Sequence, residues 1–250
     1  MYPLSAHDPR VTTIQNKDQF WIVLDDPRTK NAIDEPLIAA LAHAIETAPP
    51  GILVLTGKNG GFSTGGKLTT VSELSDLAST DPAGVAQTVR RGGNIIEDLL
   101  VSPATTVALI DGACAGAGLG IALACDYRIA TPRSRFTTAY GRLGLPSDFG
   151  THELLRRQIG VNQADHLMET STMIDAAGAQ DMGLIDVLIE KPDRKAVKRA
   201  LKGLPAPSRS NRMAGMSAIL DAEADEFARA LTRPDVQIAL ERAHRASGRD

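Results

Sequence analysis

Two apolar runs that each end in a glycine-rich turn constrain this chain more than any other feature. One is ILVLTGKNGGFSTGG, residues 52–66, and the other is TTVALIDGACAGAGLG, residues 105–120. A short continuous apolar run is typical of a strand buried on both faces of a sheet. The glycines that follow allow backbone N–H groups to approach a ligand without obstruction by side chains. Both segments therefore predict binding positions built from backbone, just past the ends of two strands.

Predicted strands and helices alternate over roughly three quarters of the chain. For example, the strand pattern FWIVLDD is followed by DEPLIAALAHAIETA, which has helical spacing and Asp34 as its N-cap. From about Pro192 onward, only helical patterns follow. We therefore predict an α/β protein with a core over residues 1–191 and a helical region over residues 192–250.

Composition narrows the class of protein. Hydrophobic residues make up 43% of the chain and charged residues 23%, with a formal net charge of −3. These values are typical of a soluble globular protein and do not favour a nucleic-acid partner. No apolar run approaches the roughly 20 residues that cross a bilayer, and the N-terminal residues lack a secretion signal pattern. Cys114 and Cys125 lack the partners of a metal site. We expect a cytoplasmic protein with two reduced cysteines, no metal and no membrane contact.

The turn over residues 111–120 admits three interpretations. A dinucleotide site needs G-x-G-x-x-G, whereas Gly116, Gly118 and Gly120 form G-x-G-x-G, and no Gly-Lys-Ser/Thr follows as in a phosphate-binding loop. The glycines are also compatible with a purely structural role, in which they allow a strand and a helix to pack closely. The presence of two matched turns favours a third interpretation, in which each turn supplies one N–H group to the same oxyanion.

These segments, in their order and spacing, resemble the enoyl-CoA hydratase/isomerase (crotonase) superfamily. The resemblance covers roughly residues 20–189 and is carried by the two turns, by DYRIA and by GRLGLPSDFGTHELLRRQIG. It implies a spiral of repeated ββα units followed by C-terminal helices that build a homotrimer, or a hexamer made of two trimers. It also implies an acyl-CoA thioester substrate, an enolate held in a backbone oxyanion hole, and no cofactor other than the coenzyme A of the substrate.

The resemblance places the oxyanion-hole N–H groups on Gly66 and Ala117. The two glutamates of the superfamily's hydratases fall on Gly120 and Tyr140, so both carboxylates are absent. Asp148 matches an aspartate that faces the substrate in the superfamily's isomerases. Its small and apolar neighbours are expected to desolvate the carboxylate and raise its pKa toward the range of a general base. The alternative role for Asp148 is to cap the following helix or hold a turn.

A single carboxylate suits a 1,3-proton shift better than hydration, which also requires an activated water. We therefore predict an enoyl-CoA double-bond isomerase with Asp148 as acid and base. The alternatives are a hydratase, hydrolase or lyase of the same superfamily, or a CoA-thioester-binding protein without catalytic activity.

Substrate-binding residues are expected in and near the two turns, at Ser63, Gly65, Lys67, Leu68, Gly116, Tyr140 and Arg28. Tyr140 is equally compatible with an aromatic pocket wall, and Lys67 and Arg28 with ordinary surface charges. The polar segment Thr69 to Pro82 is expected to be mobile and to shape substrate choice.

Overall fold

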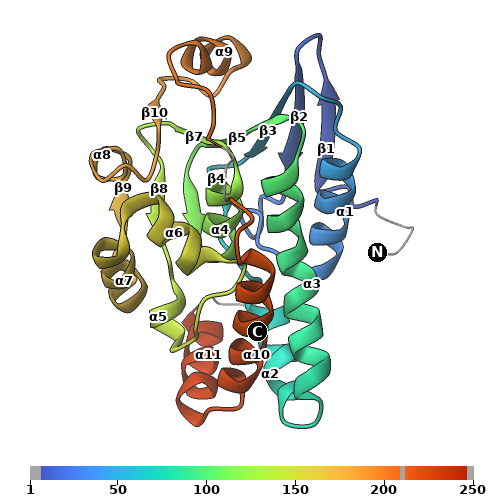
Figure 1. The fold of residues 1–250 in the computed structure, drawn as a ribbon. Coiled ribbons are helices and arrows are strands. Elements are labelled where there is room, and N and C mark those ends of the chain that lie inside the picture. Colours follow the sequence, from blue (N-terminus) through green and yellow to red (C-terminus); the bar gives the residue numbers. More distant parts are fainter. Residues whose placement is uncertain (1–6, 209–211, 247–250) are drawn as a thin grey trace.

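The structure, a computed structural model, describes residues 7–208 and 212–246 and contains two sheets (Figure 1). The larger sheet has the strand order β1-β2-β3-β5-β7-β10, and the smaller sheet has the order β4-β6-β8-β9. In the larger sheet, β1 (Val11–Gln15) is antiparallel to β2 (Gln19–Leu24), and the remaining neighbours are parallel. The predicted α/β class is confirmed.

Three ββα units repeat along the chain. In each unit the first strand joins the larger sheet, the second joins the smaller sheet, and a helix follows. The units are β3 (Ile52–Gly57), β4 (Gly61–Ser63) and α2 (Leu68–Ala78); β5 (Thr105–Ile110), β6 (Ala113–Ala115) and α4 (Ala117–Ala124); and β7 (Tyr127–Ala130), β8 (Arg135–Thr137) and α5 (Tyr140–Leu143). This repetition is the pattern expected of a ββα spiral.

The parallel strands are apolar throughout because both faces of the larger sheet are covered. Leu53 and Leu55 of β3 point into the main core with the buried residues of α1 (Glu35–Glu46) and α3 (Pro82–Val101). Val54, between them, packs on the opposite face, where α9 (Arg194–Lys202) contributes Val197. The period of two along the strand therefore divides its side chains between two cores.

Two aspartates begin the helices that cover the main face, as the Asp-Pro patterns predict. Asp34 accepts a hydrogen bond from the N–H of Leu37 in α1, at 3.2 Å, and Asp81 accepts one from the N–H of Gly84 in α3, at 2.9 Å. The segment expected to be mobile, Thr69 to Pro82, is instead mostly helix α2, which packs against α3.

The remaining elements complete the smaller sheet and add helices around it. They are α6 (Thr151–Ile159), α7 (Val161–Thr170), β9 (Ile174–Asp175), α8 (Ala176–Asp181), β10 (Val187–Leu188), α10 (Met216–Leu231) and α11 (Pro234–Ala246).

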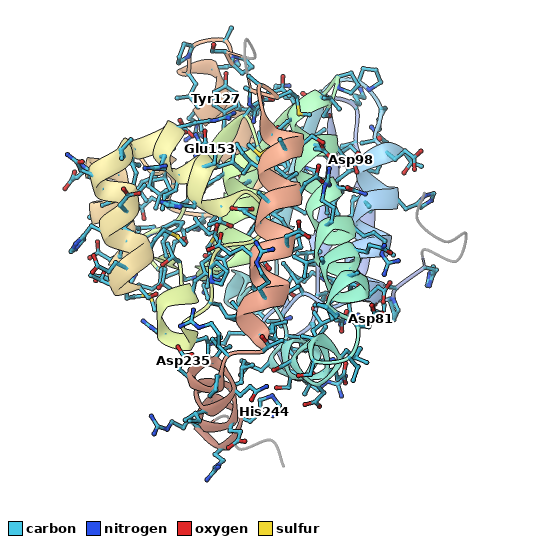
Figure 2. All side chains as sticks on the ribbon, turned by 60° about the horizontal axis from the view of Figure 1, so that its bottom comes forward. Asp81, Asp98, Tyr127, Glu153, Asp235 and His244 are labelled. Carbon is cyan, nitrogen blue, oxygen red and sulfur yellow. The ribbon has the colours of Figure 1, made fainter. Side chains whose placement is uncertain are left out.

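The C-terminal helix α10 lies alongside α3 in both views (Figures 1 and 2). It buries Met216 and Leu220 in the main core, and α11, marked by Asp235 and His244 in Figure 2, continues beyond its end. Among the residues described, no helix is both long and apolar enough to cross a membrane. The boundary at residue 191 and the assembly into trimers stay predictions.

Candidate active site

The two glycine-rich turns lie against each other because the strands before them are paired. Strands β4 and β6 run parallel, with Ser63 opposite Cys114. Gly65 has a φ of +84°, and a Cβ atom on it would lie 2.8 Å from the carbonyl oxygen of Ala115 and 3.4 Å from the Cα of Gly116. Glycine at position 65 is therefore required by both the backbone conformation and the contact between the turns.

Each turn contributes one residue to the same cavity. Gly66 and Ala117 both line a cavity of about 460 Å³, and Ala117 is the first residue of α4. Within residues 7–208 and 212–246, neither amide donates a hydrogen bond to a protein acceptor. The peptides on either side of Gly66 are fixed by Ile33, which donates to the Gly65 carbonyl at 2.7 Å and accepts from the Lys67 N–H at 2.8 Å. Two amides placed in this way are compatible with the predicted oxyanion hole, which stays a prediction.

Asp148 lines the same cavity, from the turn between α5 and α6. Its carbonyl oxygen accepts hydrogen bonds from the N–H and Oγ1 of Thr151, at 3.0 and 2.8 Å. Helix α6 has Gly150 as its N-cap and no side-chain cap. The alternative in which the Asp148 side chain caps this helix is therefore wrong.

The Asp148 carboxylate has a tyrosine as its close partner. The Tyr140 hydroxyl lies 2.6 Å from Asp148 Oδ1, to which it donates, and 3.0 Å from Thr151 Oγ1. The pKa of Asp148 is raised to about 7, mainly by burial; the hydrogen bond from Tyr140 limits the rise, and the nearby charge of Glu223 adds to it. Burial and the Asp148 charge also raise the pKa of Tyr140, which therefore stays protonated. Asp148 is thus poised to take up and release a proton near neutral pH.

Three other carboxylates line the cavity, but their surroundings differ. Asp34 is held by ion pairs with Arg10, at 2.7 Å, and with Lys67, at 3.2 Å, and its pKa is lowered. Glu35 and Glu73 are exposed on α1 and α2. Asp148 is therefore the best placed of the four to act as a base.

Neither position of the two hydratase glutamates can present a carboxylate here. A Cβ atom on Gly120 would lie 2.5 Å from Thr151 Oγ1 and 2.8 Å from the carbonyl oxygen of Phe149. There is thus no room for any side chain at residue 120. Tyr140 is buried, with its hydroxyl committed to Asp148.

The predicted substrate-binding residues are not part of the described cavity lining. Buried Ser63 donates to the carbonyl of Asn31 at 2.7 Å and accepts from the Gly65 N–H at 3.2 Å, so it holds the first turn. Lys67 pairs with Asp34, and the Arg28 N–H donates to Asp26 Oδ1 at 3.1 Å.

Leu68 begins α2 and packs beside Tyr140 in one hydrophobic cluster. Gly116 faces Gly65 in the contact between the turns. The lining described for the cavity includes none of Ser63, Gly65, Lys67, Leu68, Gly116, Tyr140 and Arg28. Their roles toward substrate stay predictions.

The apolar wall of the cavity was missed by the sequence reasoning. It comes from four helices, and its members include Ile38, Val71, Leu74, Val89 and Phe227. The three-residue spacing of Val71, Leu74 and Leu77 is a signal of α2 that polar composition hides. No local signal marks Phe227, because α10 reaches the cavity only through tertiary packing.

Neither cysteine offers a nucleophile. Cys114 and Cys125 are free and buried, and burial raises the pKa of each thiol. Both thiols therefore stay protonated and serve as packing residues. The residues described contain no group of three His, Cys, Asp or Glu side chains arranged to hold a metal ion.

Comparison with known proteins agrees with this geometry. The enoyl-CoA hydratase/isomerase family model matches residues 16–238. Enoyl-CoA isomerase/hydratase fer4 of Mycosarcoma maydis is 31% identical over 180 residues, which cover 67% of this chain and 64% of that protein. Trans-2-decenoyl-[acyl-carrier-protein] isomerase of Streptococcus mutans is 30% identical over 169 residues, covering 66% and 63%. The chain thus spans less than two thirds of the length of these relatives.

A solved structure shows the same fold. The crystal structure of enoyl-CoA hydratase from Bacillus halodurans superposes with a TM-score of 0.79 at 26% identity, covering 93% of this chain and 99% of that one. The family match extends over both turns, the Asp148 segment and α10. The chain belongs to the enoyl-CoA hydratase/isomerase family.

Proposed function

We propose that this protein is an enoyl-CoA double-bond isomerase in which Asp148 moves the proton. The observation that supports this most is the convergence of Asp148, Gly66 and Ala117 on one cavity, with no second carboxylate at the Gly120 and Tyr140 positions. The names of the Mycosarcoma and Streptococcus relatives include isomerase activity, which is consistent with the proposal.

The proposed reaction needs no co-reactant. The thioester carbonyl oxygen accepts hydrogen bonds from the N–H groups of Gly66 and Ala117. The Asp148 carboxylate removes a proton from the α carbon of a 3-enoyl thioester, and the C–H electron pair moves into an enolate on that oxygen. Asp148 then delivers the proton to the γ carbon, the electrons return from the enolate, and a 2-enoyl thioester results. A fixed N–H donor of this kind contributes about 3–4 kcal/mol to stabilisation of the transition state.

The raised pKa of Asp148, about 7, suits both halves of this cycle. A base with an ordinary carboxyl pKa would remove the proton poorly, whereas a much stronger base would release it slowly. The Tyr140 hydroxyl remains hydrogen-bonded to Oδ1 of Asp148 throughout the cycle and limits movement of the carboxylate. The apolar wall supplied by α1, α2, α3 and α10 is the proposed site of the acyl chain.

Product analysis separates this proposal from its alternatives. The protein is incubated with 3-enoyl-CoA and 2-enoyl-CoA of several chain lengths, and products are identified by mass spectrometry with chromatography. Isomerisation preserves the mass, whereas hydration adds one water, and hydrolysis releases free coenzyme A. The non-catalytic alternative predicts CoA-thioester binding without turnover.

Asp148→Asn tests the residue itself. We expect kcat for isomerisation to fall by about 10²–10⁴, the usual contribution of a general acid–base group, with KM little changed. Asp165→Asn is the matched control, because Asp165 is exposed on α7 and bonded to His152. Full activity of Asp148→Asn would overturn the proposed role.

A further inference from the structure

A second acidic residue, Glu223 of α10, is hydrogen-bonded to the turn that carries Asp148. Its Oε1 accepts a hydrogen bond from the hydroxyl of buried Ser147, and its Oε2 accepts one from the N–H of Gly150 at 2.7 Å. Ser147 and Gly150 stand immediately before Asp148 and after Phe149. One carboxylate from the C-terminal helices therefore holds both ends of the catalytic turn.

The turn needs such a support because its backbone is strained. Phe149 has a φ of +53° and Gly150 a φ of +63°, so two consecutive residues are left-handed. For a residue with a side chain, such as Phe149, this conformation is unfavourable because Cβ comes too close to the following carbonyl oxygen. Strained backbone persists only where the surrounding structure holds it in place.

Two helices supply that support from different sides. The Phe149 ring fits over Gly92 of α3, where a Cβ atom would lie 2.8 Å from Phe149 Cζ. Glu223 approaches from α10, which packs along α3, and its neighbour one turn later, Phe227, lines the cavity. Helix α10 thus contributes to the cavity wall and to the turn that presents Asp148.

We propose that Glu223 is a positioning residue that holds the Ser147–Gly150 turn through its two hydrogen bonds, so that the Asp148 carboxylate faces the cavity. The inference rests on the proposed function of Asp148 as acid and base. Glu223 itself does not line the cavity as described, and acts through the turn.

The charge of Glu223 gives this role a measurable signature. It raises the pKa of Asp148, so its removal should lower that pKa and move the rise of activity to lower pH. The hydrogen-bonding partner of the Asp148 carboxylate is Tyr140 of α5. The pKa of Glu223 is itself raised by burial and by the charge of Glu226, and it is lowered by His152 of α6. The other charged groups that line the cavity are Asp34, which caps α1, Glu35 of α1, Glu73 of α2 and Arg91 of α3.

The test compares Glu223→Gln with Glu226→Gln. Glutamine at 223 preserves size, but it removes the charge and cannot accept both hydrogen bonds. We expect kcat to fall at least about tenfold, with KM within about threefold, and the ascending limb of the pH–kcat profile to shift down by at least about half a pH unit. Glu226 is exposed on the same helix, so Glu226→Gln removes an equal charge without a bond to the turn. Glu223→Asp retains the charge and should leave the limb near its wild-type position.

A titration of the ¹³C-labelled aspartate carboxyls by NMR measures the pKa of Asp148 without turnover, with its signal assigned by its loss in Asp148→Asn. If Glu223→Gln has the same kcat and the same Asp148 pKa as Glu226→Gln, the inference is overturned. If Glu223→Gln does not fold, Ser147→Ala removes one of the two hydrogen bonds to Glu223; a kcat lowered at least about threefold supports the inference, and a wild-type kcat contradicts it. Full activity of Asp148→Asn would instead overturn the proposed function, so the two failures are distinguishable.

Discussion

Removal of the Tyr140 hydroxyl gives the sharpest test of how Asp148 is tuned. Tyr140→Phe retains the buried ring but deletes the donor that lies 2.6 Å from Asp148 Oδ1. That hydrogen bond stabilises the ionised carboxylate and holds down a pKa that burial raises to about 7. Without the bond, the pKa of Asp148 must rise, and less of the base is ionised at neutral pH.

The size of the effect follows from the strength of a hydrogen bond to a charged acceptor. Such a bond contributes about 1.5–3 kcal/mol, and one pKa unit corresponds to about 1.4 kcal/mol. The pKa of Asp148 should therefore rise by roughly one to two units in Tyr140→Phe. With a starting pKa of about 7, about half of the wild-type protein carries the base at pH 7. In the variant, roughly one tenth to one hundredth of the protein has Asp148 ionised at pH 7, compared with about half in the wild type. The value of kcat/KM at pH 7 should therefore fall about fivefold to fiftyfold.

The assay is the pH dependence of kcat/KM on the best 3-enoyl-CoA substrate, from pH 5 to pH 10. Because Asp148 acts in its ionised form, the ascending limb should move to higher pH, and activity should recover toward wild type above the new pKa. Tyr127→Phe is the matched control. Tyr127 donates to the carbonyl of Pro205, and Figure 2 labels it at the far end of the molecule from Asp235 and His244 of α11. A Tyr140→Phe limb that coincides with the wild-type limb would refute this account.

Three further substitutions have expected outcomes. Asp148→Asn should stabilise the fold increasingly as pH rises: burial raises the folded pKa from 3.8 to about 7, so stability present below pH 4 is lost as pH rises through 7. At pH 8 the free energy of unfolding, measured by urea titration, should exceed that of the wild type by about 4 kcal/mol. An equal increase at pH 5 and at pH 8 would contradict the burial of the Asp148 carboxylate. Gly92→Ala should displace the Phe149 ring, because the new Cβ would lie 2.8 Å from Cζ, and should lower kcat/KM more for long than for short acyl chains; a loss independent of chain length would argue against the acyl-chain site. Gly120→Ala should destabilise the fold by about 1–3 kcal/mol through overpacking, measured by the same titration, and a change below about 0.5 kcal/mol would show that the contact relaxes.

The sequence located the two turns of the site because glycine patterns mark them directly, and the roles that the resemblance gives to Gly66 and Ala117 stay predictions. The placement of Gly66 and Ala117 on one cavity follows from two paired strands that end in similar turns, and each turn is visible as a local motif. Asp148 was also recognised from its local motif. It lines the same cavity as Gly66 and Ala117, and the acid–base role that the resemblance implies stays a prediction.

The support for Asp148 was not predictable in the same way. Tyr140 contacts Asp148, which lies eight residues later in the sequence, and Glu223 contacts Ser147, which lies 76 residues earlier. Neither contact leaves a periodic signal in the chain, because each depends on how α5 and α10 pack. The helix α2 was missed for a related reason: Ser, Thr and Asp residues dominate its composition, although Ser75 is buried and Thr70 lines the cavity together with Val71 and Leu74.

The missing glutamate at residue 120 and the presence of Asp148 have one structural cause. The turn that carries Asp148 lies so close to α4 that the Phe149 carbonyl oxygen and Thr151 Oγ1 occupy the space in which a Gly120 Cβ would stand. A chain whose turn makes this approach has no room for a carboxylate on α4, and a chain with a glutamate at that point of α4 must hold the turn farther away. Gly120 and Asp148 therefore belong to a single arrangement, in which the same close packing excludes one carboxylate, desolvates the other and leaves it hydrogen-bonded to Tyr140.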